Sequence, residues 1–421
     1  MNKLIFNLSD IAKKMWFRCL MYCLFALLAF FAGSTLGEYV PDHLKKIVSV
    51  SAVSDILKII ASSMLAVTTF SLAIMVQALS AAATTATPRA NKLLMEDETA
   101  KNALGAFIGA FLFSIVGIIG ISAEFYDEEI IAVLFIFTIV MIIVIIAMLL
   151  KWIDHLSKLG RVTVTIDLVE QALSKSIIDR SKQPYLYSNK LEKTVDQLNE
   201  SMHPVISEQV GYVQYIDVEK LNEIALKNHV DIFVTVNAGK FLDSIEPLAY
   251  VEKKLSDEAK KEIISAFILG GDRTFVQDPR YGFIVLSEIA LRALSPGIND
   301  PGTAIDIIGT YIRTVKLWVD SFHQNENQEK EIVIKYKHVF IKNICEKDIL
   351  EDMYSALISD ASQHLIVSIR LKKSLLTIKA LGDTKFTESI GYWIERLDEM
   401  CAQSLCKEDL NRMGLIIANA P

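Results

Sequence analysis

Residues 59–88 carry no charged side chain, although this segment is long enough to cross a lipid bilayer. Small or polar residues recur along it at steps of three and four, which places them on one face of a helix. Polar groups in hydrocarbon are costly unless they meet another helix or water, so this face should point at a partner helix or a pore. The face consists of Ser62, Ala66, Thr69, Ala73, Gln77, Ser80, Thr84 and Thr87.

The apolar residues are concentrated before Lys151, in a chain of 421 residues that is 52% hydrophobic. Spanning helices need roughly 17–25 mainly apolar residues. Four stretches meet that need, at about 15–37, 59–83, 103–122 and 130–150. The first is the weakest because Arg18 lies near its start, and it also resembles a cleavable signal peptide. Residues 1–150 are therefore predicted to form an α-helical membrane domain with four transmembrane helices.

The basic residues indicate how these helices are oriented. They cluster before the first stretch, between the second and third, and after the fourth, whereas the acidic loop at 123–129 has no Lys or Arg. Three lysines in the first outer loop argue against this pattern: Lys45, Lys46 and Lys58. Because basic loops stay in the cytoplasm, a multi-pass membrane protein with both termini cytoplasmic is expected.

The third and fourth stretches differ in character. Gly105 and Gly109 in the third have the G-x-x-x-G spacing that lets a neighbouring helix approach closely. The fourth is bulky on every side, which predicts a lipid-facing helix that ends in an interfacial anchor, Lys151 and Trp152. No predicted membrane helix contains an internal acidic residue, the usual marker of a proton-coupled or cation-coupled transporter.

Several kinds of chemistry have no signature in the sequence. The five cysteines and seven histidines are scattered without metal-ligand spacing, so no metal or other cofactor is expected. P-loop, dinucleotide, zinc-protease and kinase motifs are absent. A net charge of −7, without a basic cluster that includes aromatic residues, argues against nucleic acid as a partner.

The remaining sequence predicts a cytoplasmic α+β domain. Residues 151–210 should form a linker helix, interrupted at the β-branched run 162–166, and a connecting segment. In 211–320, strands at 211–216, 231–236 and 248–251, with a glycine turn at 237–240, favour a small β-barrel or sandwich. Asp217 should cap a helix over 218–228. A polar hinge at 321–331 then leads to a helical C-terminal region at 332–421, which begins with a candidate strand at 332–340.

Two segments start helices in the same way, GGDRTFVQDPR at 270–280 and LRALSPGINDPGTA at 291–304. Asp278 and Asp300 each precede a proline, which suits them to cap helices whose first residue needs no N–H group. Arginines and other polar residues gather around both caps. Two interpretations remain open: a site for a phosphate or lipid headgroup, or a structural lock in which the charges pair with one another. The residues concerned are Asp272, Arg273, Thr274, Gln277, Asp278, Arg292, Ser295, Asn299, Asp300 and Thr303.

Together with SLAIMVQALSAAATTATPR and GYVQYID, these motifs resemble a bacterial family of predicted inner-membrane proteins of unknown function. The resemblance covers most of residues 10–320. It implies a helical membrane part followed by a cytoplasmic domain, without an assigned reaction. The matching positions are Pro88, Arg89, Gly211, Tyr212, Asp217, Arg273, Gln277, Asp278, Arg292, Ser295, Pro296, Asn299, Asp300, Pro301, Thr303 and Ala304.

The first functional hypothesis is a homo-oligomeric ion channel or pore that the cytoplasmic domain gates, because four helices cannot easily enclose a water path alone. Its lining candidates are Ser62, Thr69, Gln77, Ser80, Thr84, Thr87 and Arg89. The alternative is a membrane-anchored ligand-binding or signalling module for a small anionic ligand. A lipid-headgroup enzyme is a minor alternative that lacks a nucleophile and base, so an enzyme is not the favoured interpretation. The expected partners are the lipid bilayer and further copies of the chain.

Overall fold

A computed structural model describes residues 17, 24, 31, 48–95, 97–123, 126–327 and 333–418. The chain divides into two compact units. The N-terminal unit comprises residues 1–84 and 91–164, and the C-terminal unit comprises residues 85–90 and 165–421. The first membrane helix that the sequence predicts, at about 15–37, lies outside the described residues except for three helical positions, Phe17, Leu24 and Phe31.

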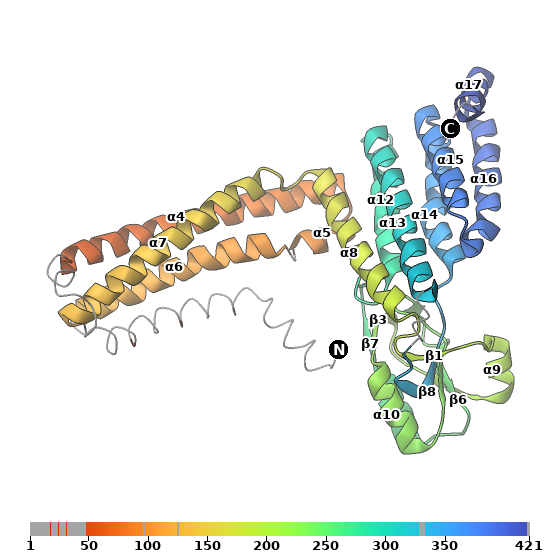
Figure 1. Ribbon diagram of the computed structural model, residues 1–421, viewed down its shortest axis with the longest axis horizontal. Helices are drawn as coiled ribbons and strands as arrows, with labels where there is room; N and C mark the ends of the chain where they lie inside the picture. Colours follow the sequence, from red (N-terminus) through yellow and green to blue (C-terminus); the bar gives the residue numbers. More distant parts are fainter. Residues whose placement is uncertain are drawn as a thin grey trace. The chain divides into compact units, whose positions relative to one another are not determined.

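Three long helices form the described part of the N-terminal unit, together with the first residues of α8 and part of the short helix α5 (Figure 1). Each is long and apolar enough to span a membrane. Three of the four predicted membrane helices are therefore present, and each is longer than its apolar stretch. The bounds are α4 (Val50–Thr85), α5 (Pro88–Met95), α6 (Glu98–Ser122) and α7 (Glu128–Leu156).

The three long helices are buried to different extents. Within the most apolar window of each, 56% of residues are buried for α6, 39% for α7 and 22% for α4. Gly105 and Gly109 on α6 are buried, as expected for a helix that packs closely through small residues. A Cβ atom added to Gly117 would lie 2.9 Å from Leu57 Cδ1 of α4. We conclude that α6 is the packing helix, while α4 leaves most of its surface open.

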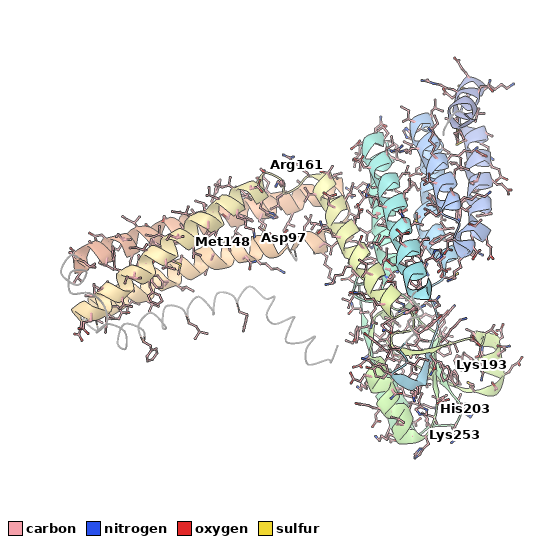
Figure 2. The ribbon with its side chains drawn as sticks, in the orientation of Figure 1. Asp97, Met148, Arg161, Lys193, His203 and Lys253 are labelled. Carbon is pink, nitrogen blue, oxygen red and sulfur yellow. The ribbon has the colours of Figure 1, made fainter. Side chains whose placement is uncertain are left out.

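Polar contacts join the last turns of α7 to the interior of α4 and to the start of α6. The indole of Trp152 on α7 donates a 2.9 Å hydrogen bond to Ser71 Oγ on α4, and both side chains are buried. The prediction that Trp152 is an interfacial anchor is therefore wrong, because its ring belongs to the helix core. Asp97, labelled in Figure 2, accepts a hydrogen bond from Ala100 N and lies 3.4 Å from His155 Nε2 at the end of α7.

The linker helix does not run as the sequence predicts. α7 ends at Leu156, residues 157–161 form a turn, and α8 (Val162–Lys182) begins at the β-branched run that was expected to interrupt a helix. Gly160 adopts a φ of +84°, which only glycine reaches readily, so the break occurs there instead. Residues 181–210, predicted as a connecting segment, also contain two short strands and a helix.

Two small sheets lie in the C-terminal unit, which confirms the α+β class. A five-stranded sheet has the order β1-β8-β4-β6-β2, with β1, β8 and β4 parallel, and a three-stranded antiparallel sheet has the order β5-β3-β7. The larger sheet is open rather than closed into a barrel. The bounds are β1 (Ser188–Lys190), β2 (His203–Ile206), β3 (Gly211–Ile216), β4 (Ile232–Val234), β5 (Phe241–Leu242), β6 (Pro247–Val251), β7 (Phe267–Gly270) and β8 (Tyr336–Ile341).

One hydrophobic core joins both sheets to α10. Its members include Val213 of β3, Leu221 of α10 and Ile232 of β4, none of which is exposed. Asp217 caps α10 by accepting a hydrogen bond from Lys220 N at 3.1 Å, as predicted. The helices among the strands are α9 (Val195–Ser201), α10 (Val218–Asn228) and α11 (Asp257–Ile264). Lys193, His203 and Lys253 lie around this part of the unit (Figure 2).

The remaining helices lie side by side in a bundle (Figure 1). α12 packs against α13 and α14, and α15 packs against α13, α16 and α17. A polar hinge was predicted at 321–331, but α13 continues through its first part to Asn327, and residues 328–331 lie outside the described residues. The bounds are α12 (Pro279–Leu294), α13 (Pro301–Asn327), α14 (Glu346–Ala361), α15 (Leu365–Ala380), α16 (Thr384–Ser404) and α17 (Lys407–Ala418).

Candidate functional site

A cavity of about 590 Å³ lies at the carboxyl ends of β4 and β8, two parallel neighbours in the larger sheet. Ligands in α/β folds bind beyond the carboxyl ends of parallel strands, and pockets for small molecules hold roughly 300–1,000 Å³. The segments that follow the two strands, 235–241 and 342–344, form much of the wall. The other lining residues are Val195, Tyr212, Glu246, Pro247, Tyr250, Arg273, Asp278, Arg280 and Asp348.

An ion pair between Arg273 and Asp278 lies in the cavity wall. Arg273 Nε donates to Asp278 Oδ2 at 2.8 Å, and Nη2 donates to Oδ1 at 3.0 Å. Asp278 is only 2% exposed and caps α12 by accepting a hydrogen bond from Tyr281 N at 3.2 Å. Burial raises the pKa of Asp278 to about 6, although the charge and hydrogen bonds of Arg273 oppose that shift. The cap prediction is confirmed, and the ion pair ties the cap to Arg273 in the preceding loop.

The glycine turn after β4 lies directly on this ion pair. Gly239 has a φ of +89°, and a Cβ atom there would be 2.1 Å from Asp278 Oδ2 and 2.6 Å from Arg273 Nη2. Its N–H group donates to Val213 O at 2.8 Å, which ties the turn to β3. Only glycine allows the backbone to approach the pair this closely.

Backbone contacts with β3 hold the loop that precedes α12. Gln277 donates to Ile216 O at 3.3 Å and accepts from Ile216 N at 2.9 Å, so its amide continues the strand pairing. Thr274 Oγ1 donates to Gln214 O at 3.2 Å, and Gln214 Nε2 donates to the carbonyl of Asp272 at 2.7 Å. The polar residues around this cap therefore position Arg273 and Asp278.

Arg280 lines the cavity and Arg180 binds Asn237 in its wall, and sequence reasoning missed both. Arg180 of α8 is 4% exposed and donates to Asn237 Oδ1 at 3.2 Å, while its Nε has no hydrogen-bond partner. Burial lowers the pKa of Arg180 to about 10. Arg280 binds Asp352 with two hydrogen bonds of 2.6 and 3.0 Å and Asp348 with one of 2.8 Å. Arg280 ends the segment 270–280, but nothing local marks its role or that of Arg180, because the partners of both residues are distant in sequence.

Lys342 differs from the other charged residues that line the cavity. Lys240 pairs with Glu246 at 2.7 Å, and the lining arginines pair as described above. Lys342 is exposed and makes no ion pair with any residue that the structure describes. Tyr212 and Phe241 form an aromatic part of the wall, with ring centroids 5.0 Å apart. The cavity thus combines an unpaired cation with an aromatic surface.

The second Asp-Pro cap is confirmed but lies elsewhere. Asp300 accepts from Thr303 N at 3.2 Å and from Thr303 Oγ1 at 2.6 Å, and these bonds lower the pKa of Asp300. Ser295 Oγ donates to Arg292 O at 2.6 Å, and Asn299 adopts a φ of +50° in the turn. The 16 residues of α12 separate the two caps by about 24 Å of helix. The structure therefore does not bring Arg292, Ser295, Asn299, Asp300 or Thr303 to the cavity.

The pore-lining candidates fall into two groups. The residues exposed on α4 are Ser62, Thr69, Gln77 and Ser80. The side chain of Thr84 is not among those that the structure describes. Thr87 is buried, and its hydroxyl accepts from Ala90 N at 3.2 Å. Arg89 forms an ion pair with Glu288 of α12. Among the described residues, no three His, Cys, Asp or Glu side chains are placed to hold a metal ion.

Comparisons with known proteins identify a family without an assigned activity. Uncharacterized proteins of Mycobacterium bovis (Mb1321c) and Mycobacterium tuberculosis (Rv1290c) are each 28% identical to the chain over 111 residues. The match covers 25% of this chain and 21% of each relative. No solved structure matches the chain. The family described as "Predicted membrane protein (DUF2254)" matches residues 12–377, and the chain therefore belongs to this family.

Proposed function

We propose that this protein is a membrane-anchored ligand-binding module whose C-terminal unit holds a small organic anion in the cavity at the ends of β4 and β8. One observation carries the proposal: Lys342, which makes no ion pair with any described residue, lies in the wall of a cavity with the volume of a small-molecule site. We expect the protein to lie in the bacterial inner membrane, with both termini and the cavity in the cytoplasm.

The pairing of the other charges favours Lys342 as the contact for the ligand. Arg273 and Arg280 each make two hydrogen bonds to one carboxylate, and a ligand would have to displace that carboxylate to bind them. A ligand could bind Lys342 without displacing a carboxylate. Phe241 is 48% exposed and offers a flat apolar surface beside Tyr212. A phosphate group at Lys342 and a ring against Phe241 would use both features.

Adenosine monophosphate is a suitable probe, because it carries one phosphate and one aromatic ring system. Thermal unfolding of the full-length protein in detergent should shift upward with this nucleotide and remain unchanged with adenosine. Glycerol 3-phosphate tests recognition of phosphate without a ring, as in a lipid headgroup. If none of the three compounds raises the unfolding midpoint, the proposal fails for phosphate ligands. If glycerol 3-phosphate raised the unfolding midpoint as much as adenosine monophosphate does, the aromatic wall would not contribute to binding.

A homo-oligomeric pore is the second candidate, supported by the exposed polar face of α4. Ser62, Thr69, Gln77 and Ser80 are open in the single chain, and the most apolar window of α4 is only 22% buried. The mass and symmetry of the purified detergent complex test this candidate, because it requires a ring with α4 around the axis. In reconstituted protein, Gln77→Leu and Thr69→Val should then change the conductance, and a monomeric protein would count against a pore.

A further inference from the structure

Two segments join the two units, α8 and residues 85–90. α8 contacts the cavity wall, and residues 85–90 contact α12. α8 runs from the N-terminal unit into the C-terminal unit, and its Arg180 donates to Asn237 in the cavity wall. Residues 85–90 belong to the C-terminal unit, but the chain on either side of them belongs to the N-terminal unit. This short segment begins with the last residue of α4 and is held by the ion pair of Arg89 with Glu288.

The surroundings of Arg89 place it close to the cavity. Its hydrogen bond to Glu288 raises the pKa of Arg89, and the nearby hydroxyls of Tyr281 and Tyr212 contribute in the same direction. Tyr212 lines the cavity. The guanidinium of Arg273 lies over the Tyr281 ring, 5.4 Å from its centroid. Tyr281 therefore interacts electrostatically with Arg89 and contacts Arg273 through its ring.

α12 connects the two places as a single packed element. Asp278 caps its first turn, and Glu288 follows ten positions later, which is about 15 Å along the axis. A Cβ atom at Gly282 would lie 2.7 Å from Leu173 Cβ, so α12 packs directly on α8. A helix held this closely transmits a displacement of its N-terminus along its length rather than absorbing it.

We propose that α12 couples occupancy of the cavity to residues 85–90, with the Arg89–Glu288 ion pair as the contact through which a bound ligand acts on the end of α4. This inference rests on the proposed ligand-binding function. Because coupling between two sites is reciprocal, a change at the ion pair must also change the cavity wall.

Hydrogen–deuterium exchange of the full-length protein in detergent tests this coupling without a ligand. Glu288→Gln keeps the shape of the side chain but removes the charge that Arg89 binds. Exchange in the cavity segments 237–241 and 273–281 should become faster by about fivefold or more, as expected for typical coupling between sites. Arg89→Gln should give the same pattern. Lys316→Gln, which breaks the exposed ion pair with Asp320 on α13, is the matched control and should leave both segments unchanged.

Faster exchange confined to residues 86–92 and 284–292 in both variants would overturn the coupling. The converse experiment adds adenosine monophosphate to the wild-type protein and should slow exchange in residues 86–90. If the nucleotide protects the cavity segments but not residues 86–90, the ligand site stands and the coupling fails. If the nucleotide does not bind at all, the proposed ligand fails, and the comparison of the variants still decides the coupling.

Discussion

Asp278 and Asp300 begin two successive helices with the same Asp-Pro sequence, yet their surroundings differ. Asp278 is buried, pairs with Arg273 and has a raised pKa, whereas Asp300 is exposed, bonds to Thr303 and has a lowered pKa. Both carboxylates cap their helices, so the local sequence determines the backbone equally well in the two regions. The difference teaches that tertiary contacts decide which cap becomes part of a candidate site.

The largest expected effect comes from breaking the buried pair. Arg273→Ala leaves the Asp278 carboxylate buried without its partner, which should lower the free energy of unfolding by about 3–5 kcal/mol. Thermal or denaturant unfolding of the full-length protein measures this loss. The double variant Arg273→Ala/Asp278→Ala should regain part of it, because no unpaired charge remains. A single variant as stable as the wild type would show that the pair does not lock the loop.

Gly239→Ala should have the next largest effect. A side chain at a positive φ costs about 1–3 kcal/mol, and the close approach to Asp278 adds about 1–3 kcal/mol of overpacking. A total loss of about 3 kcal/mol in the free energy of unfolding is expected from these terms. Gly391→Ala on α16 is the matched control, because an added Cβ atom there meets nothing within 4 Å. Equal stability of the two variants would contradict the close packing of the turn on the ion pair.

The two caps should respond to pH in opposite directions. The folded protein holds its Asp278 proton up to about pH 6, against a usual pKa of 3.8, so this group's contribution to stability falls as pH rises through that window. The shift of about two units corresponds to about 3 kcal/mol at most. The pKa of Asp300 is lowered, so its contribution is present above about pH 4 and is lost as pH falls through its folded pKa.

Unfolding midpoints from about pH 2 to about pH 7 check these signs. The stability of the wild type relative to Asp278→Asn should decrease as pH rises from 4 to about 6. The stability of the wild type relative to Asp300→Asn should instead fall as the pH drops below about 4 and stay nearly constant above about pH 5. If the stability of the wild type relative to Asp278→Asn increased with pH, Arg273 rather than burial would determine the pKa of Asp278.

The smallest of these effects belongs to the exposed cap. Asp300→Ala removes one acceptor at the start of α13 and should cost about 1 kcal/mol of stability, the usual loss for a helix cap. Asp300→Ser keeps an acceptor and should restore most of this loss. If Asp300→Ala cost as much as Arg273→Ala, the distinction between the two regions would disappear.

Local signals explain which features the sequence could predict. The caps Asp217, Asp278 and Asp300 were predictable because each depends on a residue three positions away. The place of β8 between β1 and β4 in the larger sheet was not, since β8 pairs in parallel with β4, about a hundred residues earlier. The cavity escaped sequence reasoning for the same reason. Its wall combines the turn at 237–240, Arg273 and Lys342, which only the tertiary fold brings together.

The most direct test of the central claim is an equilibrium titration of the full-length protein with adenosine monophosphate. Wild-type protein should bind the nucleotide, and Lys342→Glu should weaken binding by about tenfold or more, because it replaces the unpaired cation with a repelling charge. Lys347→Glu makes the same change in charge five residues later, outside the cavity lining, and should bind as the wild type does. Equal affinity of all three proteins, or no binding to the wild type, would contradict the account.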